Sequence, residues 1–156
     1  MQQEPPKISE IRFSAMNFLT LREHSAKELK DKLLRKYMQV ELVEEAVSGL
    51  IEQNLQSDER FAQAFVSMRQ RQGKGPVIIK MELREKGVAA ELIALFIDDL
   101  DPLWLELVRE VRSRKFRGIA VIDQRERAKQ MRFLHSRGFS GRHIQAAFVA
   151  KLDDDC

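Results

Sequence analysis

The amino-acid sequence repeats itself about every 50 residues, and this internal repeat restricts the possible folds more than any other feature. Displacing the chain by 50 and then by 51 residues brings apolar positions into register, together with one basic residue and the turn that follows it. The aligned sets are Leu33, Leu83 and Leu134; Lys36, Lys86 and Arg137; Met38, Val88 and Phe139; and Val43, Ile93 and Ile144. Matching buried positions at a fixed period are typical of stacked helical units. Any helical chain aligns with itself through its leucines, but that alternative does not require a basic residue and a glycine turn to match.

Start and stop signals divide each repeat into three helices. Ser25 with Glu28 forms a capping box, in which each side chain satisfies a free backbone N–H. Pro76 suits a first helical position, and Gly87 can adopt the left-handed conformation that ends a helix. Similar signals at Ser57, Pro102, Gly118, Asp123, Gly138 and Ser140 complete the pattern. The expected helices run from about Ile8 to Glu23, Ala26 to Tyr37, Val40 to Asn54, Asp58 to the Gly73 break, Pro76 to Gly87, Ala89 to Leu100, Pro102 to Gly118, Gln124 to Arg137, and Ser140 to Phe148.

Apolar residues at three- and four-residue spacing mark the face that each helix buries. The expected inward positions are Ile8, Ile11, Ala15, Phe18, Leu19, Leu29, Leu33, Val43, Val47, Leu50, Ile51, Phe61, Phe65, Met68, Ile79, Leu83, Leu92, Ile93, Phe96, Ile97, Trp104, Leu107, Val108, Val111, Ile144, Ala147 and Phe148.

The sequence therefore predicts an all-α fold of three tandem three-helix repeats, nine helices that form an elongated, curved array. A single threonine, Thr20, and only 11 glycines and prolines agree with this. The predicted parts are a flexible N-terminal tail at 1–7, repeats at 8–56, 57–101 and 102–152, and an acidic C-terminal tail at 153–156.

Composition excludes several classes of protein. The longest stretch without a charged residue is Phe13 to Leu21, nine residues, whereas a membrane-spanning helix needs about 20 apolar ones. The first residues lack the pattern of a secretion signal, so we expect a cytoplasmic protein. The one cysteine, Cys156, cannot form an internal disulfide or a thiolate metal cluster.

The near-neutral net charge of +3 hides strong blocks of like charge. Residues 37–59 hold six acids and no base, and residues 88–106 hold five acids and no base. Residues 60–86 hold seven bases and two acids, and residues 107–142 hold eleven bases and three acids. Nine of those eleven bases are arginine, whose planar fork binds carboxylates and phosphates. The third repeat is therefore expected to meet a polyanion or an acidic protein surface, while the acidic helices are read as solvated faces.

Residues that carry catalysis or bind metals are not grouped in this sequence. His24, His135 and His143 have no Cys, Asp or Glu at ligand spacing. The segment Gly73-Lys74-Gly75-Pro76 lacks the spacing and the following Ser or Thr of a phosphate-binding loop. We expect no cofactor, no metal and no enzymatic activity.

The most distinctive segment is Asp58-Glu59-Arg60-Phe61-Ala62-Gln63-Ala64-Phe65-Val66, followed by Arg69, Gly75-Pro76, Ile79, Glu82-Leu83 and Lys86-Gly87. This segment resembles the signature of the RecX family. The third repeat is similar to that family in Phe133-Leu134, Arg137-Gly138-Phe139-Ser140, Ile144 and Ala147, and the first in Ala15, Phe18-Leu19, Arg22-Glu23, Ser25, Glu28-Leu29 and Leu33. The resemblance covers nearly the whole chain and departs from the family at Tyr37, where a glycine is usual.

The resemblance implies a bacterial regulatory protein that binds the RecA recombinase filament and lowers its ATP hydrolysis, strand exchange and co-protease activity, in recombinational repair and the SOS response. We expect a monomer that also binds single- or double-stranded DNA weakly and without sequence preference. The residues expected to contact RecA or DNA are Arg69, Arg71, Lys74, Lys80, Arg84, Lys86, Arg112, Arg114, Arg117, Arg125, Arg132 and Arg137. Arg112, Arg114 and Arg117 in particular are expected to be exposed and free to meet a partner.

Two other functions fit the same charge pattern. The second and third helices of each repeat, joined by a short turn, also resemble a helix-turn-helix, so a sequence-independent DNA-binding protein is the main alternative. The acidic third helices of the first two repeats argue against it, since they would repel phosphates. An RNA- or ribosome-associated helical module is a third possibility.

Overall fold

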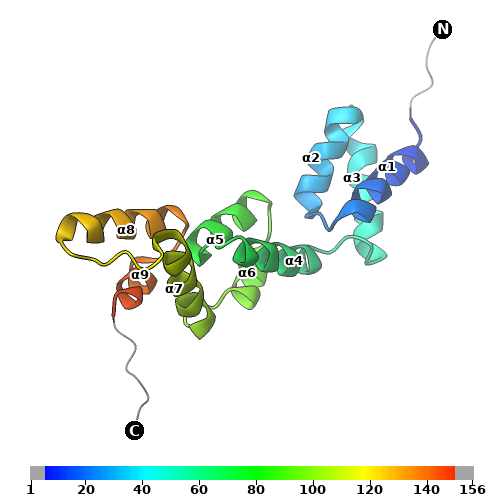
Figure 1. Ribbon diagram of the computed structural model, residues 1–156. Helices are drawn as coiled ribbons and strands as arrows, with labels where there is room; N and C mark the ends of the chain where they lie inside the picture. The colour runs from blue at the N-terminus through cyan, green and yellow to red at the C-terminus, as the bar shows by residue number, and fades with distance from the viewer. Residues whose placement is uncertain (1–5, 150–156) are drawn as a thin grey trace. The chain divides into compact units, whose positions relative to one another are not determined.

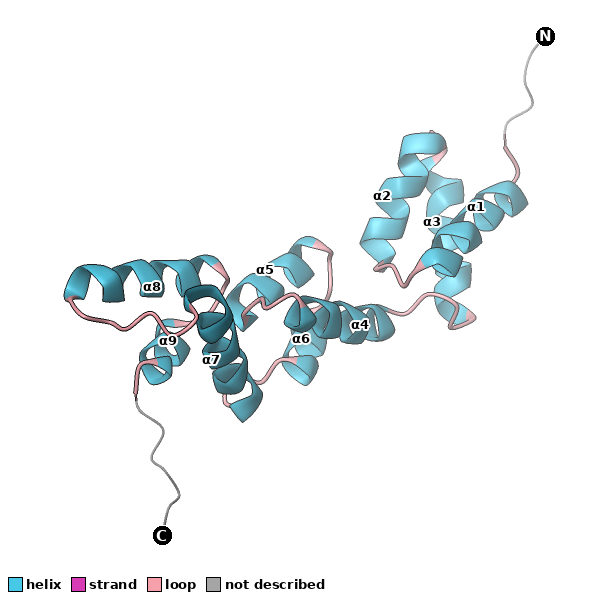
Figure 2. Cartoon of the chain, viewed as in Figure 1, coloured by secondary structure: helices cyan, strands magenta, loops and turns pink. Residues whose placement is uncertain are grey.

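The computed structural model describes residues 6–149, and within that range the chain forms nine helices and no strand (Figures 1 and 2). The helices are α1 (Ile8–Leu21), α2 (Ala26–Lys36), α3 (Val40–Glu52), α4 (Asp58–Arg71), α5 (Pro76–Glu85), α6 (Ala90–Phe96), α7 (Pro102–Phe116), α8 (Gln124–Ser136) and α9 (Gly141–Ala147). The predicted all-α fold of three-helix repeats is confirmed. Most of the predicted N-terminal tail and the whole predicted acidic tail, with Cys156, lie outside the described residues.

The serine and aspartate caps expected from the sequence are present, but the reciprocal half of the capping box is wrong, because the Glu28 carboxylate binds Arg22 and Lys86 and not the Ser25 backbone N–H. The hydroxyl of Ser25 accepts a hydrogen bond from the Glu28 backbone N–H, and Ser57, Asp123 and Ser140 cap α4, α8 and α9 in the same way. Such caps depend on residues only three positions apart, so the local sequence determines them. At Tyr37 the backbone is extended, with φ −119°, and the helix ends there without the usual glycine.

Some expected helix ends and buried positions are wrong. The sixth helix stops at Phe96 instead of Leu100, because Asp98 turns the chain: its side chain accepts a hydrogen bond from Leu100 N, and its carbonyl oxygen accepts one from Trp104 Nε1. Ile8 and Ile51 are exposed by 37% and 45%, since each lies at the edge of its helix's apolar stripe.

Contacts along the chain form two compact units. Unit 1 comprises the residues up to Phe65 together with Leu83–Phe96, and unit 2 comprises Val66–Glu82 together with the residues from Ile97 onward. The second repeat contributes residues to both units.

Each unit contains a cluster of fully buried apolar side chains. In unit 1, α1, α2 and α3 bury Ile11, Leu29, Leu33, Val43 and Leu50. In unit 2, α7, α8, α9 and the turn between α8 and α9 bury Val108, Leu134, Phe139, Ile144 and Ala147. Each large side chain contributes about 1.5–3 kcal/mol of transfer free energy, so these clusters stabilise each unit.

Candidate functional site

The basic residue that recurs in the repeat alignment makes a contact between repeats in unit 1. Lys86 Nζ donates a hydrogen bond to Glu28 Oε2 at 2.9 Å, although the two residues are 58 positions apart. Arg22 binds the same carboxylate with both terminal nitrogens, at 2.8 and 2.9 Å. Burial raises the pKa of Glu28, but the hydrogen bonds from Arg22 and Lys86 outweigh it and lower the pKa to about 2. The Glu28 side chain is therefore a buried carboxylate that stays ionised.

Gly87, the residue after Lys86, makes a second close contact between the same two repeats. Gly87 has a left-handed φ of +78°, and a Cβ atom built on it would lie 2.9 Å from Lys27 Cβ. Lys27 Nζ in turn donates a hydrogen bond to the Glu85 carbonyl oxygen at 2.9 Å. The turn between α5 and α6 therefore packs directly on the first turn of α2, where a larger residue has no room.

Unit 2 contains the equivalent contact with different chemistry. Arg137 Nη2 donates a hydrogen bond to the Gln72 carbonyl oxygen at 2.5 Å, and the Arg137 carbonyl oxygen accepts one from Gly75 N at 2.8 Å. Gly138 has a φ of +95°, and its added Cβ would lie 2.6 Å from Ile78 Cβ. A Cβ on Gly75 would overlap the backbone carbonyl of Gly138. Two stretches of main chain thus touch, and only glycine permits this approach.

The most distinctive segment of the sequence, which begins at Asp58, makes hydrogen bonds inside unit 1. Asp58 Oδ1 accepts hydrogen bonds from Ala26 N at 2.8 Å and from Gln56 Nε2 at 2.9 Å. Arg60 Nε donates to Glu23 Oε1 at 3.2 Å. These bonds join the start of α4 to the loop between α1 and α2 within unit 1.

Several of the expected partner residues are used inside the chain. Arg69 pairs with Glu82 at 2.6 Å, and Lys80 pairs with Asp99 at 2.6 Å, both within unit 2. Lys86 and Arg137 form the repeat contacts described above. Of the others in the second repeat, Lys74 is half-buried, whereas Arg71 and Arg84 are exposed.

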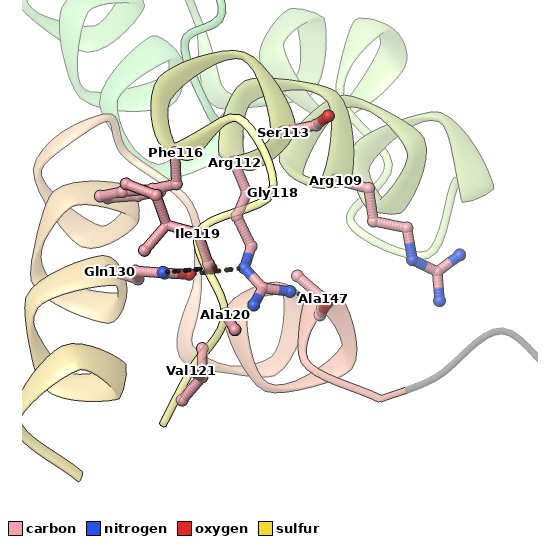
Figure 3. Close-up of a pocket in the computed structure, with 10 residues that line it drawn as sticks. All are labelled: Arg109, Arg112, Ser113, Phe116, Gly118, Ile119, Ala120, Val121, Gln130 and Ala147. Atoms are coloured by element: carbon pink, nitrogen blue, oxygen red, sulfur yellow. Dashed lines mark hydrogen bonds between the residues drawn. The ribbon is translucent and has the colours of Figure 1, made fainter. Parts of the chain in front are cut away.

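The expectation that Arg112 is exposed and free is wrong. Its Nε donates to Gln130 Oε1 at 2.9 Å and its Nη1 donates to the Ala147 carbonyl oxygen at 3.0 Å, across a pocket of about 370 Å³ (Figure 3). The guanidinium lies 3.9 Å from the centre of the Phe148 ring. Burial, with a smaller effect from Arg127, lowers the pKa of Arg112. Position 112 follows Trp104 and Val108 at four-residue spacing, so it continues the buried face of α7, and this spacing could have revealed its role.

Four of the expected partner residues in the third repeat are exposed: Arg114, Arg117, Arg125 and Arg132. Arg114 contacts Glu110 one turn earlier on α7, but its side chain remains 77% exposed. Arg117 follows the last residue of α7 in a left-handed conformation with φ 39°. Unit 2 therefore presents guanidinium groups at the end of α7 and along α8.

The buried histidines have roles within the fold. His24 Nδ1 lies 3.0 Å from the Arg22 carbonyl oxygen and its Nε2 lies 2.8 Å from Lys32 Nζ, and burial lowers the pKa of His24. His143 Nε2 lies 3.0 Å from the Asp99 carbonyl oxygen. Over residues 6–149, no group of His, Cys, Asp and Glu side chains could hold a metal ion, and no helix is long and apolar enough to span a membrane.

Family comparisons match the repeats individually. Models of the first, second and third three-helix domains of RecX match residues 12–50, 57–95 and 103–148. The chain is 42% identical over 145 residues to the regulatory protein RecX of Pseudomonas fluorescens strain Pf-5, covering 93% of this chain and 94% of that protein. It is 38% identical to the RecX of Halorhodospira halophila, covering 93% and 90%.

Solved structures show the same fold. The crystal structure of RecX from Lactobacillus salivarius superposes with a TM-score of 0.74 at 23% identity, covering 90% of this chain and 93% of that one. A second crystal structure, of a regulatory protein RecX, gives a TM-score of 0.76 at 23% identity and covers 88% and 71%.

Proposed function

We propose that this chain, which belongs to the RecX family, binds the RecA recombinase filament and lowers its ATP hydrolysis, strand exchange and co-protease activity. The observation that carries the proposal is the match of all three RecX domain models along the chain, together with relatives called regulatory protein RecX at about 40% identity. The proposal includes action in recombinational repair and the SOS response, in the cytoplasm, as a monomer without a cofactor or an enzymatic activity of its own.

The charge distribution supports a contact through unit 2. Residues 107–142 carry eleven bases and three acids, and Arg114, Arg117, Arg125 and Arg132 are exposed. Exposed arginines keep their donors available for carboxylates or phosphates on a partner. A protein that contacts several filament subunits at once gains avidity without one strong site.

The direct test measures ATP hydrolysis by RecA on single-stranded DNA with this protein at a substoichiometric ratio. We expect inhibition by the parent protein and a severe loss of inhibition in the variant Arg114→Glu with Arg117→Glu, because the new charges repel an acidic partner. The melting temperature of that variant should stay close to the parent's, since both side chains are exposed. A parent protein that leaves ATP hydrolysis unchanged would contradict the proposed function.

Weak DNA binding without sequence preference is the second candidate, and the exposed arginines of α8 together with Arg142 on α9 favour it. The α3 helix, which would be a recognition helix, exposes Glu41, Glu44 and Glu45 instead. Binding that rests on phosphate contacts should weaken equally for duplex and single strand as salt rises, because counterions are released on contact. Sequence-selective binding that survives moderate salt would favour the helix-turn-helix function over RecA regulation.

A further inference from the structure

Helix α7 has a second apolar row, which the core of unit 2 covers only in part. Leu103, Leu107 and Val111 follow one another at four-residue spacing, so they lie on one face of the helix. Leu103 is 42% exposed, and Leu107 and Val111 are half-buried. This row is distinct from the buried row of Trp104 and Val108.

Two residues of this row, Leu107 and Val111, form the floor of a groove within unit 2. The groove has a volume of about 860 Å³, and Leu107, Val111 and Phe133 contribute its apolar surface. A smaller hollow lined by Leu103 shares Gln70, Leu107 and Glu110 with it, so the two are continuous along α7. Gly73 borders the groove at its basic end, where an added Cβ would lie 3.0 Å from Val111 Cγ2. The groove is therefore long enough to follow two turns of α7.

Charges are unequal at the two ends of this groove. Arg71, Arg114, Lys115 and Arg137 line it toward the end of α7, whereas Glu106 lies in the hollow toward the start of that helix. Arg114 has Glu110 as a partner, but neither Arg71 nor Lys115 forms an ion pair with another residue in the range 6–149. Both side chains are exposed, so a bound carboxylate would reach them without displacing an existing one.

We infer that this groove binds an acidic segment of a partner protein, whose apolar side chains lie on Leu103, Leu107 and Val111 and whose carboxylates meet Arg71 and Lys115. A protein segment fits better than a nucleic acid for two reasons. The wall contains two carboxylates, Glu106 and Glu110, and a phosphate chain, which is charged along its whole length, would pass them, whereas a protein segment can carry its carboxylates at the basic end alone. The floor offers little ring surface for a base to stack on, because Lys115 Nζ already lies 5.2 Å from the centre of the Phe133 ring. An acidic protein segment with leucine-like side chains complements both the floor and the charges.

A peptide experiment tests the groove without RecA. The probe is a fluorescent helical peptide with three leucines at four-residue spacing and glutamates in one end turn, compared with a peptide that has lysines instead of the glutamates. Fluorescence anisotropy with the full chain should show binding of the acidic peptide only. The variant Arg71→Glu with Lys115→Glu should weaken that binding at least about tenfold. The control Arg125→Glu with Lys129→Glu makes the same change of charge at exposed positions of α8 outside the groove, and it should bind like the parent.

Three outcomes would overturn the inference. They are the absence of binding of the acidic peptide to the parent, equal binding to the groove variant, and an equal loss in the α8 control. Displacement of the peptide by oligo-dT, together with loss of oligo-dT binding in the groove variant alone, would identify the occupant as nucleic acid and would also overturn it.

The identity of the partner rests on the proposed function, so a second arm measures binding to RecA filaments. The groove variant should bind filaments about tenfold more weakly than the parent and than the single variant Lys129→Glu, which changes an exposed residue of α8 that lies outside the groove and is not among the expected RecA contacts. If the parent binds the peptide but has no effect on RecA, the proposed function fails while the groove assignment stands. If the parent inhibits RecA and the groove variant inhibits equally well, the groove is not the contact and the proposed function stands. Circular dichroism checks that both variants keep the parent's helical content.

Discussion

The two repeat contacts, one in each unit, place aligned basic residues against partners of different charge. In unit 1, Lys86 and Arg22 share the carboxylate of Glu28, so one negative charge lies between two positive ones. In unit 2, Arg137 binds the neutral carbonyl oxygen of Gln72, and Arg112 binds the neutral groups of Gln130 and Ala147. Lys36, the third aligned basic residue, forms no ion pair within residues 6–149, and its Nζ lies 3.5 Å from Ser14 Oγ. Of the three aligned residues, only Lys86 therefore lies against a carboxylate. Alignment of a charged residue between repeats therefore does not show which group that residue contacts.

The two contacts also differ in how their stability depends on pH. A buried ion pair weakens when its carboxylate is protonated, whereas backbone hydrogen bonds between glycine turns do not titrate. Unit 1 should therefore respond more to pH, and unit 2 should respond more to added side-chain volume. The following predictions test this difference, from the largest expected effect to the smallest.

The largest effect is expected for Gly75→Ala. The new Cβ overlaps the Gly138 backbone, which cannot move aside as a flexible side chain could, so the free energy of unfolding should fall by about 3 kcal/mol. Urea unfolding followed by fluorescence of Trp104, the only tryptophan and a buried residue of unit 2, measures it. Gly141→Ala is the control, because its Cβ meets nothing within 4 Å among the described residues, and it should change stability by less than about 1 kcal/mol. Equal stability of the two variants would contradict the close backbone contact.

The second prediction concerns the buried carboxylate of unit 1. Glu28→Gln leaves Arg22 and Lys86 without their anion, and the free energy of unfolding should fall by about 2 kcal/mol, less than for a fully buried pair because these two partners are 48% and 40% exposed. Hydrogen exchange of α1 to α3 measures this loss. Glu110→Gln removes an exposed pair and should cost less than about 0.5 kcal/mol. A Glu28 variant as stable as the Glu110 variant would mean that the buried carboxylate contributes little to unit 1.

The third prediction separates structural from exposed arginines in unit 2. Arg112→Ala removes two hydrogen bonds and the stacking on Phe148, so the free energy of unfolding should fall by about 1.5 kcal/mol. Arg114→Ala should change it by less than about 0.5 kcal/mol, since that side chain is 77% exposed. Thermal unfolding read by Trp104 fluorescence compares them. Equal melting temperatures of the two variants would show that Arg112 does not stabilise the fold in the way proposed.

The smallest effect is expected from mild acid. The pKa of His24 is lowered by burial, so its contribution to stability is present above its ordinary pKa of 6.5 and is lost as the pH falls below that value. The pKa of Glu28, about 2, also lies below its ordinary value of 4.5, so its contribution is present above pH 4.5 and is lost as the pH falls toward 2.

Unit 1 should therefore unfold before unit 2 in an acid titration. Circular dichroism at 222 nm, which reports on both units, should decrease before the fluorescence of Trp104 changes. Glu28→Gln should remove the part of the pH dependence below pH 4.5 and keep the part near neutrality. Coincident transitions of the two signals would show that acid does not act on unit 1 first.

Much of the fold follows from local sequence, but less of the candidate site does. The caps at Ser25 and Ser140 could be predicted because cap and acceptor are three residues apart. The early end of α6 could not, because the hydrogen bonds at Asp98 compete with a sequence that is otherwise suitable for a helix. The burial of Arg112 was missed because a charged residue was assumed to leave the apolar stripe, although its spacing continues it. The groove on α7 was missed because Arg71 and Phe133 reach it from other helices.

The sequence by itself determined the helices, their caps, the three repeats and the excess of arginine in the third, because each of these depends on residues that are close along the chain or on composition. Only the tertiary structure decided that Lys86 pairs with Glu28 while Arg137 binds a carbonyl group, and that unit 2 has a groove with several basic residues in its lining. These contacts join residues 58 and 65 positions apart. Their chemistry depends on which side chains the packed helices bring together, and the local pattern of apolar and charged residues does not contain that information.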